Sequence, residues 1–335
     1  MRVRLLIISS ISLLLLSACQ WQRPHIEQQF STYLARIANI QDVAPMPEPS
    51  IQTQSLPDKR ALNHQIPAVT LGILDSYQLR HCQLFHLIAE RNSILGKVQD
   101  QFRNLDYQMA LLHGLHHCMN SPEIDPKLKQ QLTQVTKTKE QQLPWQWHNF
   151  LYTSDVMRHQ LSSHRWYLRE RNYGDIQSAL TELLKVNQWV MTRPHSTPLP
   201  QPITPYQETL DKSPLLGDIM FSMTNLTHWL NTATQQLKHH DSAIWCGSNR
   251  DQRRFKQLQN VFYKYYVGDI QPYLASVDGA YQQIQLMAPL FASSSLSAVA
   301  PFPLKKVHQE FRQATLHHIA YWQHLFERCG VKVGK

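Results

Sequence analysis

Apolar residues recur every three or four positions through most of this chain, which is the spacing of one face of an α-helix. Between 71 and 90 these positions are Ile73, Leu74, Tyr77, Cys82, Phe85, Ile88 and Ala89. The pattern is interrupted around Gly96 and then resumes. It predicts helices over about 25–40, 71–90, 98–119, 122–142, 144–169, 175–191, 215–240, 249–287 and 301–329.

Prolines mark breaks in this pattern, because proline cannot donate the backbone hydrogen bond that a helix interior needs. They are dense between 45 and 67, and six of them fall between 193 and 214. The second stretch is either a hinge between two subdomains or a long loop on one continuous body. Pro272 is expected to kink or break the helix that contains it.

No stretch alternates apolar and polar residues over a useful length, and only 10 glycines are present to form tight turns. Both observations disfavour a many-stranded β fold. The chain is predicted to be all-α, a multi-helix bundle with one body or two helical subdomains and proline-rich loops. Its expected regions are a signal (1–18), a lipidated N-terminus with a short helix and a proline-rich segment (19–70), a helical region (71–192), a proline-rich loop (193–214) and a C-terminal helical region (215–335).

The first residues have the parts of an export signal. Arg2 and Arg4 are followed by an apolar run from 5 to 16, which is short for a membrane span and is followed at once by polar residues. The sequence Leu-Ser-Ala-Cys at 16–19 resembles the lipobox of bacterial lipoproteins. That resemblance implies cleavage after residue 18 and lipidation of Cys19 as the new N-terminus.

The lipobox resemblance also implies a location. Two or three acyl chains on one residue hold a protein firmly on a membrane, whereas a single chain holds it only marginally. The residue after Cys19 is Gln20 rather than aspartate. By the sorting rules of such lipoproteins in double-membrane bacteria, we expect the periplasmic face of the outer membrane.

The other four cysteines are Cys82, Cys118, Cys246 and Cys329. An even number in an oxidising compartment predicts two disulfides, for which three connectivities exist. We favour Cys82 with Cys118 and Cys246 with Cys329, because each pair lies inside one half of the chain. The alternative is four reduced, buried thiols.

Several segments resemble one family of proteobacterial lipoproteins that is defined by a single domain of unknown function. The first segment is 81–98, which contains the run Ala-Glu-Arg-Asn-Ser-Ile-Leu-Gly-Lys-Val. The second is 268–274, Gly-Asp-Ile-Gln-Pro-Tyr-Leu, and the third is 322–330. The resemblance covers nearly the whole mature chain. It implies export and lipidation, and it brings no catalytic residue and no cofactor.

The most concentrated polar cluster contains Glu90, Arg91, Asn92, Ser93 and Lys97. One interpretation is a turn between helices, held by an ion pair and by caps on the helix ends. The other is a polar pocket in which Arg91 and Lys97 hold an anionic group.

The charge balance is mildly basic. The chain has 33 lysines and arginines against 24 acidic residues; without Arg2 and Arg4 the counts are 31 and 24, a net charge of +7. These charges are scattered, so they favour anionic envelope partners such as lipid phosphates only weakly. Export argues against nucleic acid as a partner.

The histidines and the common catalytic motifs do not indicate a metal site or an active site. His113, His116 and His117 share a helix beside Cys118, but the chain has no HExxH, CxxC or CxxCH motif and no nucleophile elbow. No metal site, catalytic residue or cofactor is therefore predicted.

The leading hypothesis is a helical scaffold or binding module anchored to the membrane by its N-terminal lipid, with an envelope protein or an anionic lipid or glycan as partner. The alternative is an enzyme or carrier acting on a cell-envelope lipid or glycan.

Overall fold

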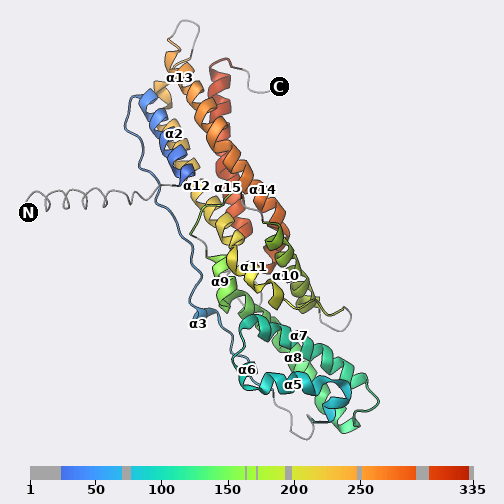
Figure 1. The fold of residues 1–335 in the computed structure, drawn as a ribbon. Helices are drawn as coiled ribbons and strands as arrows, with labels where there is room; N and C mark the ends of the chain where they lie inside the picture. Colours follow the sequence, from blue (N-terminus) through green and yellow to red (C-terminus); the bar gives the residue numbers. More distant parts are fainter. Residues whose placement is uncertain are drawn as a thin grey trace, which may run out of the picture. The chain divides into compact units, whose positions relative to one another are not determined.

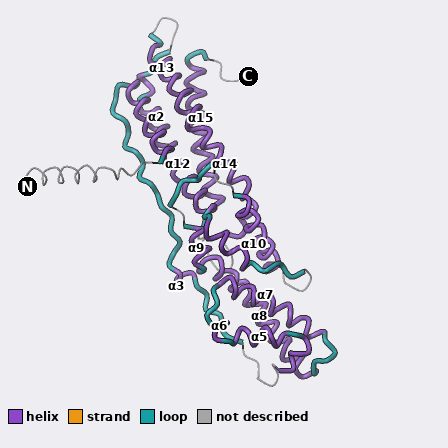
Figure 2. Tube along the Cα trace, in the orientation of Figure 1, coloured by secondary structure: helices purple, strands orange, loops and turns teal. Residues whose placement is uncertain are grey.

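We analysed the fold in a computed structural model that describes residues 24–69, 77–162, 164–170, 173–192, 198–246, 251–291 and 302–331. Every regular element in these ranges is helical, and none is a strand (Figure 1, Figure 2). The prediction of an all-α, multi-helix fold is therefore confirmed. The export signal and Cys19 lie outside the described residues.

The helices have the following bounds: α2 (His25–Gln41), α3 (Lys59–Leu62), η1 (Leu79–Cys82), α5 (Leu84–Asn92), α6 (Ile94–Lys97), α7 (Gln101–Asn120), α8 (Pro126–Thr153), α9 (Asp155–Leu161), α10 (Gly174–Thr192), η2 (Thr204–Tyr206), α11 (Gln207–Lys212), α12 (Leu215–His239), η3 (Asp241–Ala243), α13 (Arg253–Val261), η4 (Phe262–Ile270), α14 (Gln271–Ile284), η5 (Gln285–Phe291) and α15 (Leu304–Arg328). In the described ranges, no helix is long and apolar enough to cross a membrane.

The chain forms two compact units. The first unit consists of Met1–Pro49, Asn231–Leu274 and His318–Lys335, and the second of Ser50–Leu230 and Ala275–His317. The proline-rich stretch 193–214 lies inside the second unit, so it does not separate the two.

The described part of that stretch is not a loop throughout, because it includes η2 and α11. Asp106 on α7 explains the start of η2. Its carboxylate accepts hydrogen bonds from the backbone N–H groups of Ile203 at 2.8 Å and Thr204 at 3.0 Å, which fixes the first turn.

The structure also revises three predicted helices. The helix expected over 71–90 is η1 followed by α5, broken where Gln83 adopts a left-handed conformation with φ 64°, and residues 70–76 are outside the described ranges. The helix expected from 122 starts at Pro126, where the Asp125 side chain caps it. It then continues through Pro144 instead of restarting there.

A π-helix explains how the chain passes Pro272 without a break. The nine residues of η4 are π-helical, and α14 begins directly after them at Gln271. A proline ring clashes with the carbonyl four residues earlier in a regular α-helix. The wider turn of the π-helix comes just before the proline, where it relieves that clash.

The first unit is built around a fully buried polar network. The indole Nε1 of Trp322 donates to the Tyr33 hydroxyl at 3.0 Å and lies 3.2 Å from His318 Nε2. The Tyr33 hydroxyl is 3.0 Å from His318 Nε2, and the Thr234 hydroxyl is 2.9 Å from His318 Nδ1. Because an indole can only donate, Nε2 of His318 is the acceptor and Nδ1 carries the proton. The imidazole is therefore neutral.

A disulfide closes the first unit, with the Cα atoms of Cys246 and Cys329 4.9 Å apart. In the second unit the Cα atoms of Cys82 and Cys118 are 5.2 Å apart. These are the two pairs that the sequence favoured.

Side-chain amides fix the extended, proline-rich segment that precedes residue 70. In the second unit, Asn149 on α8 bonds both backbone groups of His64, at 2.8 Å each, and Gln142 donates to the carbonyl of Pro67 at 2.9 Å. Asn225 on α12 bonds both backbone groups of Gln52 in the same way. Because no strand lies beside this segment in the described ranges, the amides take the place of a sheet partner.

We predict that acid destabilises the first unit through His318. Burial lowers the pKa of this imidazole from 6.5 to about 3, so the unfolded chain binds the proton first. Above pH 6.5, His318 should add no pH dependence to the free energy of unfolding. As the pH falls from 6.5 to about 3, this group should lower the free energy of unfolding by about 1.4 kcal/mol per pH unit.

Urea titrations between pH 4 and 8 measure this dependence. His318→Gln should flatten it, whereas His317→Gln, which removes an exposed neighbour, should leave it unchanged. An equally steep loss of stability in the His318→Gln variant would refute the assignment.

Candidate functional site

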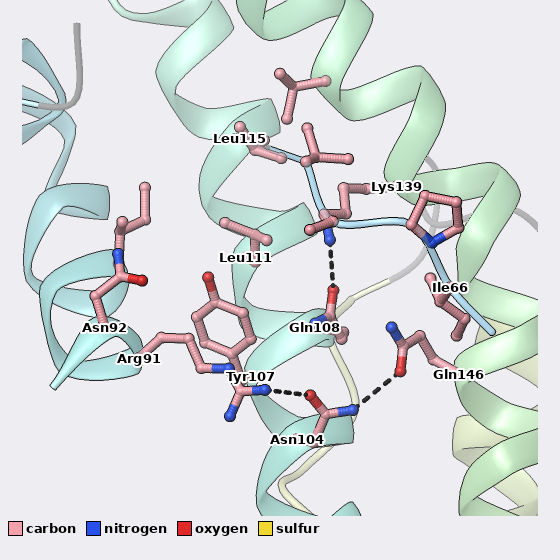
Figure 3. Close-up of a pocket in the computed structure, with 15 residues that line it drawn as sticks. Ile66, Arg91, Asn92, Asn104, Tyr107, Gln108, Leu111, Leu115, Lys139 and Gln146 are labelled. Carbon is pink, nitrogen blue, oxygen red and sulfur yellow. Dashed lines mark hydrogen bonds between the residues drawn. The ribbon is translucent and has the colours of Figure 1, made fainter. Parts of the chain in front are cut away.

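A cavity of about 410 Å³ in the second unit is the candidate site (Figure 3). It lies among α5, α7, α8 and the end of the extended segment, residues 66–69. One part of its lining is apolar: Ile66, Pro67, Ala68, Val69, Ile88, Leu111, Leu115 and Val135. The other part is polar: Arg91, Asn92, Asn104, Tyr107, Gln108, Lys139 and Gln146.

Arg91 reaches the cavity from the last turn of α5, and a set of oxygen atoms fixes its guanidinium group. Nη1 donates to the carbonyl of Gly96 and to Gln99 Oε1 at 2.9 Å, and Nη2 donates to Asn104 Oδ1 at 3.1 Å. The guanidinium carbon lies 5.4 Å from the centre of the Tyr107 ring, within cation–π range. All these partners are neutral, so the positive charge of Arg91 is not balanced by them.

Lys139 enters the same cavity from α8, on the side opposite Arg91, as Figure 3 shows. Its ammonium group donates to Gln108 Oε1 at 3.4 Å, and Gln108 is itself buried. Burial, and then the positive charge of Arg91, lower the pKa of Lys139 below its usual value. Burial also raises the pKa of Tyr107, an effect that Arg91 partly offsets.

The cavity thus brings two cations together without an acidic partner. Among the described residues, no carboxylate lies within ion-pair distance of Arg91 or Lys139, and none lines the cavity. Two like charges that share a partly desolvated site repel each other. A bound anion would remove that repulsion.

The turn after Arg91 is shaped by Ser93 and Gly96. The Ser93 side chain caps α6 by accepting from the Gly96 N–H at 3.0 Å. A Cβ atom added at Gly96 would lie 2.2 Å from the carbonyl oxygen of Glu90, which is backbone and cannot move aside easily. Only glycine therefore lets this turn fold back onto α5 and present its carbonyl to Arg91.

The structure separates the polar residues that the sequence grouped together. Arg91 and Asn92 line the cavity, whereas Glu90 and Lys97 are exposed and do not. The cluster contains a capped turn, and Arg91 and Asn92 form part of the cavity lining. Glu90 makes no ion pair with any described residue.

Family membership comes from the sequence as a whole. The model of a family described as "Protein of unknown function (DUF3080)" matches residues 30–333. The chain belongs to that family. Neither a curated protein nor a solved structure matches the chain. Membership in DUF3080 confirms the resemblance to a family that is defined by a single domain of unknown function.

Lys139 is the charged cavity residue that the sequence prediction missed, along with the polar Asn104, Tyr107, Gln108 and Gln146. It is 48 positions from Arg91, on a helix whose inner positions include Leu132, Val135 and Leu143. The sequence did contain a sign of this residue, because a lysine stands on this face of the helix between apolar residues at helical spacing. Its proximity to Arg91 depends on the packing of α5, α7 and α8, which spacing along the chain does not give.

His113, His116 and His117 of α7 lie in different surroundings. His116 is paired with Glu140, at 3.0 Å, while His113 and His117 are exposed. In the parts of the chain that the structure describes, no three His, Cys, Asp or Glu residues are grouped so that they could hold a metal ion.

The proximity of the two cations predicts a measurable coupling. Arg91→Gln removes a positive charge from beside Lys139, so the pKa of Lys139 should rise towards its usual value. The ¹⁵Nζ resonance of Lys139, followed with pH in the wild type and the variant, measures this change.

Lys97→Gln, which removes an exposed cation of the same neighbourhood, should leave the pKa of Lys139 where it is. Equal effects of the two substitutions would mean that Arg91 is not the neighbour that Lys139 senses.

Proposed function

We propose that this chain is an exported, lipid-anchored envelope protein whose helical body binds an anionic ligand that has an apolar part. The observation that carries the proposal is the pairing of Arg91 and Lys139 in a cavity whose described lining includes no carboxylate. Partly buried cations without a described counter-ion cost free energy, and perturbed charges of this kind are a sign of a functional site.

The form of the cavity supports the class of ligand. Arg91 uses three of its five N–H groups within the protein, and the two others, on Nη2 and Nε, suit phosphate or carboxylate oxygens; Lys139 adds a point charge. Leu111, Leu115 and Val135 supply apolar lining in the same cavity. A ligand with a charged head and a hydrocarbon portion satisfies both halves of this lining.

The chemistry of the lining favours binding over catalysis. In the described part of the chain, no carboxylate, histidine, serine, threonine or cysteine lines the cavity. These are the residue types that most often carry acid–base or nucleophilic steps. Binding and release need only the cations, the amides and the apolar wall.

The sequence of the first 20 residues supports the proposed location. A positive start, an apolar run and a lipobox-like Leu-Ser-Ala-Cys predict cleavage and lipidation at Cys19, and Gln20 favours the outer membrane. The paired cysteines fit an oxidising compartment, because disulfides persist there. Such a location would expose the cavity to anionic lipids and glycans of the envelope.

Titration with a soluble, short-chain phosphatidic acid tests the binding proposal, with the phosphatidylcholine of equal chain length and inorganic phosphate as comparison ligands. We expect the phosphatidic acid to bind best, because it alone offers both an exposed anion and hydrocarbon. Replacing Arg91 or Lys139 by glutamine should weaken binding by roughly tenfold or more, since each removes a charge-assisted hydrogen bond.

Lys97→Gln is the matched control, because Lys97 is close in sequence and exposed but does not line the cavity. Equal losses from Lys97→Gln and Arg91→Gln would assign the effect to general surface charge and refute the pocket. Recovery of a chemically altered lipid after incubation would make the chain an enzyme instead of a binding module.

The proposed anchoring predicts the mature N-terminus. Intact mass spectrometry of protein purified from membranes should show a chain that begins at Cys19 and carries acyl groups, and Cys19→Ser should abolish acylation. A mature chain that begins elsewhere and carries no lipid would contradict the location.

A further inference from the structure

Three apolar side chains project from the turn beside the cavity. Ile94, Leu95 and Val98 are 86%, 81% and 77% exposed, which makes them the most exposed large apolar residues in the described part of the chain. We call these three residues the apolar tip. Exposed apolar residues that are scattered singly need no explanation, but a group of three within five positions indicates a contact surface.

The apolar tip is held in this exposed position by polar contacts beneath it. Ser93 caps α6 through the Gly96 N–H, and Arg91 bonds the Gly96 carbonyl. The close approach of Gly96 to the end of α5 leaves no space for the turn to fold further inward. The exposed side chains are therefore part of a fixed turn.

The apolar tip and the cavity share a residue. Arg91 lines the cavity and also bonds the backbone of the tip at Gly96, and Asn92, which lines the cavity, is two residues before Ile94. The wall of the cavity that contains Arg91 and Asn92 therefore adjoins the tip.

We propose that the apolar tip docks into a lipid surface that carries anionic headgroups, from which the cavity takes its ligand. This inference rests on the proposed function, which it extends by naming the source of the ligand. Between Asn92 and Gln99 the only charged residue is Lys97, which is exposed. A lysine among apolar residues is the arrangement by which interfacial segments combine hydrocarbon insertion with attraction to anionic lipid.

The size of the apolar tip favours a lipid surface over a folded protein. A stable protein–protein contact buries about 800 Å² on each partner and needs complementary shape. Three side chains on and directly after the four-residue helix α6 supply a small part of such an area. A bilayer adapts its shape to what enters it, so a small apolar wedge with one cation is sufficient there.

Vesicle sedimentation tests the docking. The mature chain, residues 19–335 with Cys19→Ser so that no acyl group contributes, is mixed with vesicles of phosphatidylcholine alone or with an equal part of phosphatidylglycerol. Replacement of Ile94, Leu95 and Val98 by serine should lower the partition coefficient on the anionic vesicles roughly tenfold. Lys97→Glu should lower it on the anionic vesicles and leave it unchanged on the neutral ones.

The matched control replaces Met191, Leu286 and Leu316 by serine, because these are also exposed apolar residues of the second unit. This variant should partition as the wild type does. Equal losses in the two triple variants, or wild-type partition of the tip variant, would overturn the docking proposal. So would a dimeric wild type that the tip substitutions make monomeric, because the tip would then join copies of the chain.

Titration of the tip variant with short-chain phosphatidic acid separates this proposal from the proposed function. Wild-type affinity for the soluble lipid, together with weakened vesicle partition, is the expected result. Failure of the wild type to bind the soluble lipid would refute the ligand class itself. Normal binding of the soluble lipid with unchanged vesicle partition would refute the docking surface alone.

Discussion

The Cys82–Cys118 bond is the constraint on which the candidate site depends. Helix α5 has nine residues, too few to be stable alone, and it follows a break at Gln83. The disulfide ties its start to α7, where Gly114 lets Leu84 approach closely; a Cβ atom at Gly114 would lie 2.6 Å from the Leu84 side chain. This anchored end sets where the other end of α5, with Arg91, meets α7.

Hydrogen bonds to neutral oxygen atoms then orient the guanidinium group of Arg91. Helix α8 places Lys139 on the other side of the cavity. Asn104 is central, because it accepts from Arg91 and donates to Gln146 on α8 at 2.9 Å. The helices are thus linked through amides, and no carboxylate of the described residues forms an ion pair with either cation. In the proposed function an anion supplies the missing negative charge, and this links the packing of the second unit to its proposed role.

The sequence predicted those features that are local or set by simple counting. Helical spacing gave the all-α class, the even cysteine number gave two disulfides, and the Glu-Arg-Asn-Ser cluster located one wall of the cavity. It could not predict Lys139 as the second cation in place of Lys97, because their distances from Arg91 are set by packing between helices. Nor did it predict that Pro144 lies inside one helix, since tertiary contacts along α8 outweigh the lost backbone hydrogen bond.

The central claim is that an anion supplies the charge missing between Arg91 and Lys139. The pKa of the Lys139 ammonium group, measured by ¹⁵Nζ NMR in the free protein and with saturating short-chain phosphatidic acid, tests this directly. The account predicts that the pKa, held below its usual value by burial and by Arg91, rises when the lipid binds. A lipid that binds and leaves the pKa of Lys139 unchanged would contradict it.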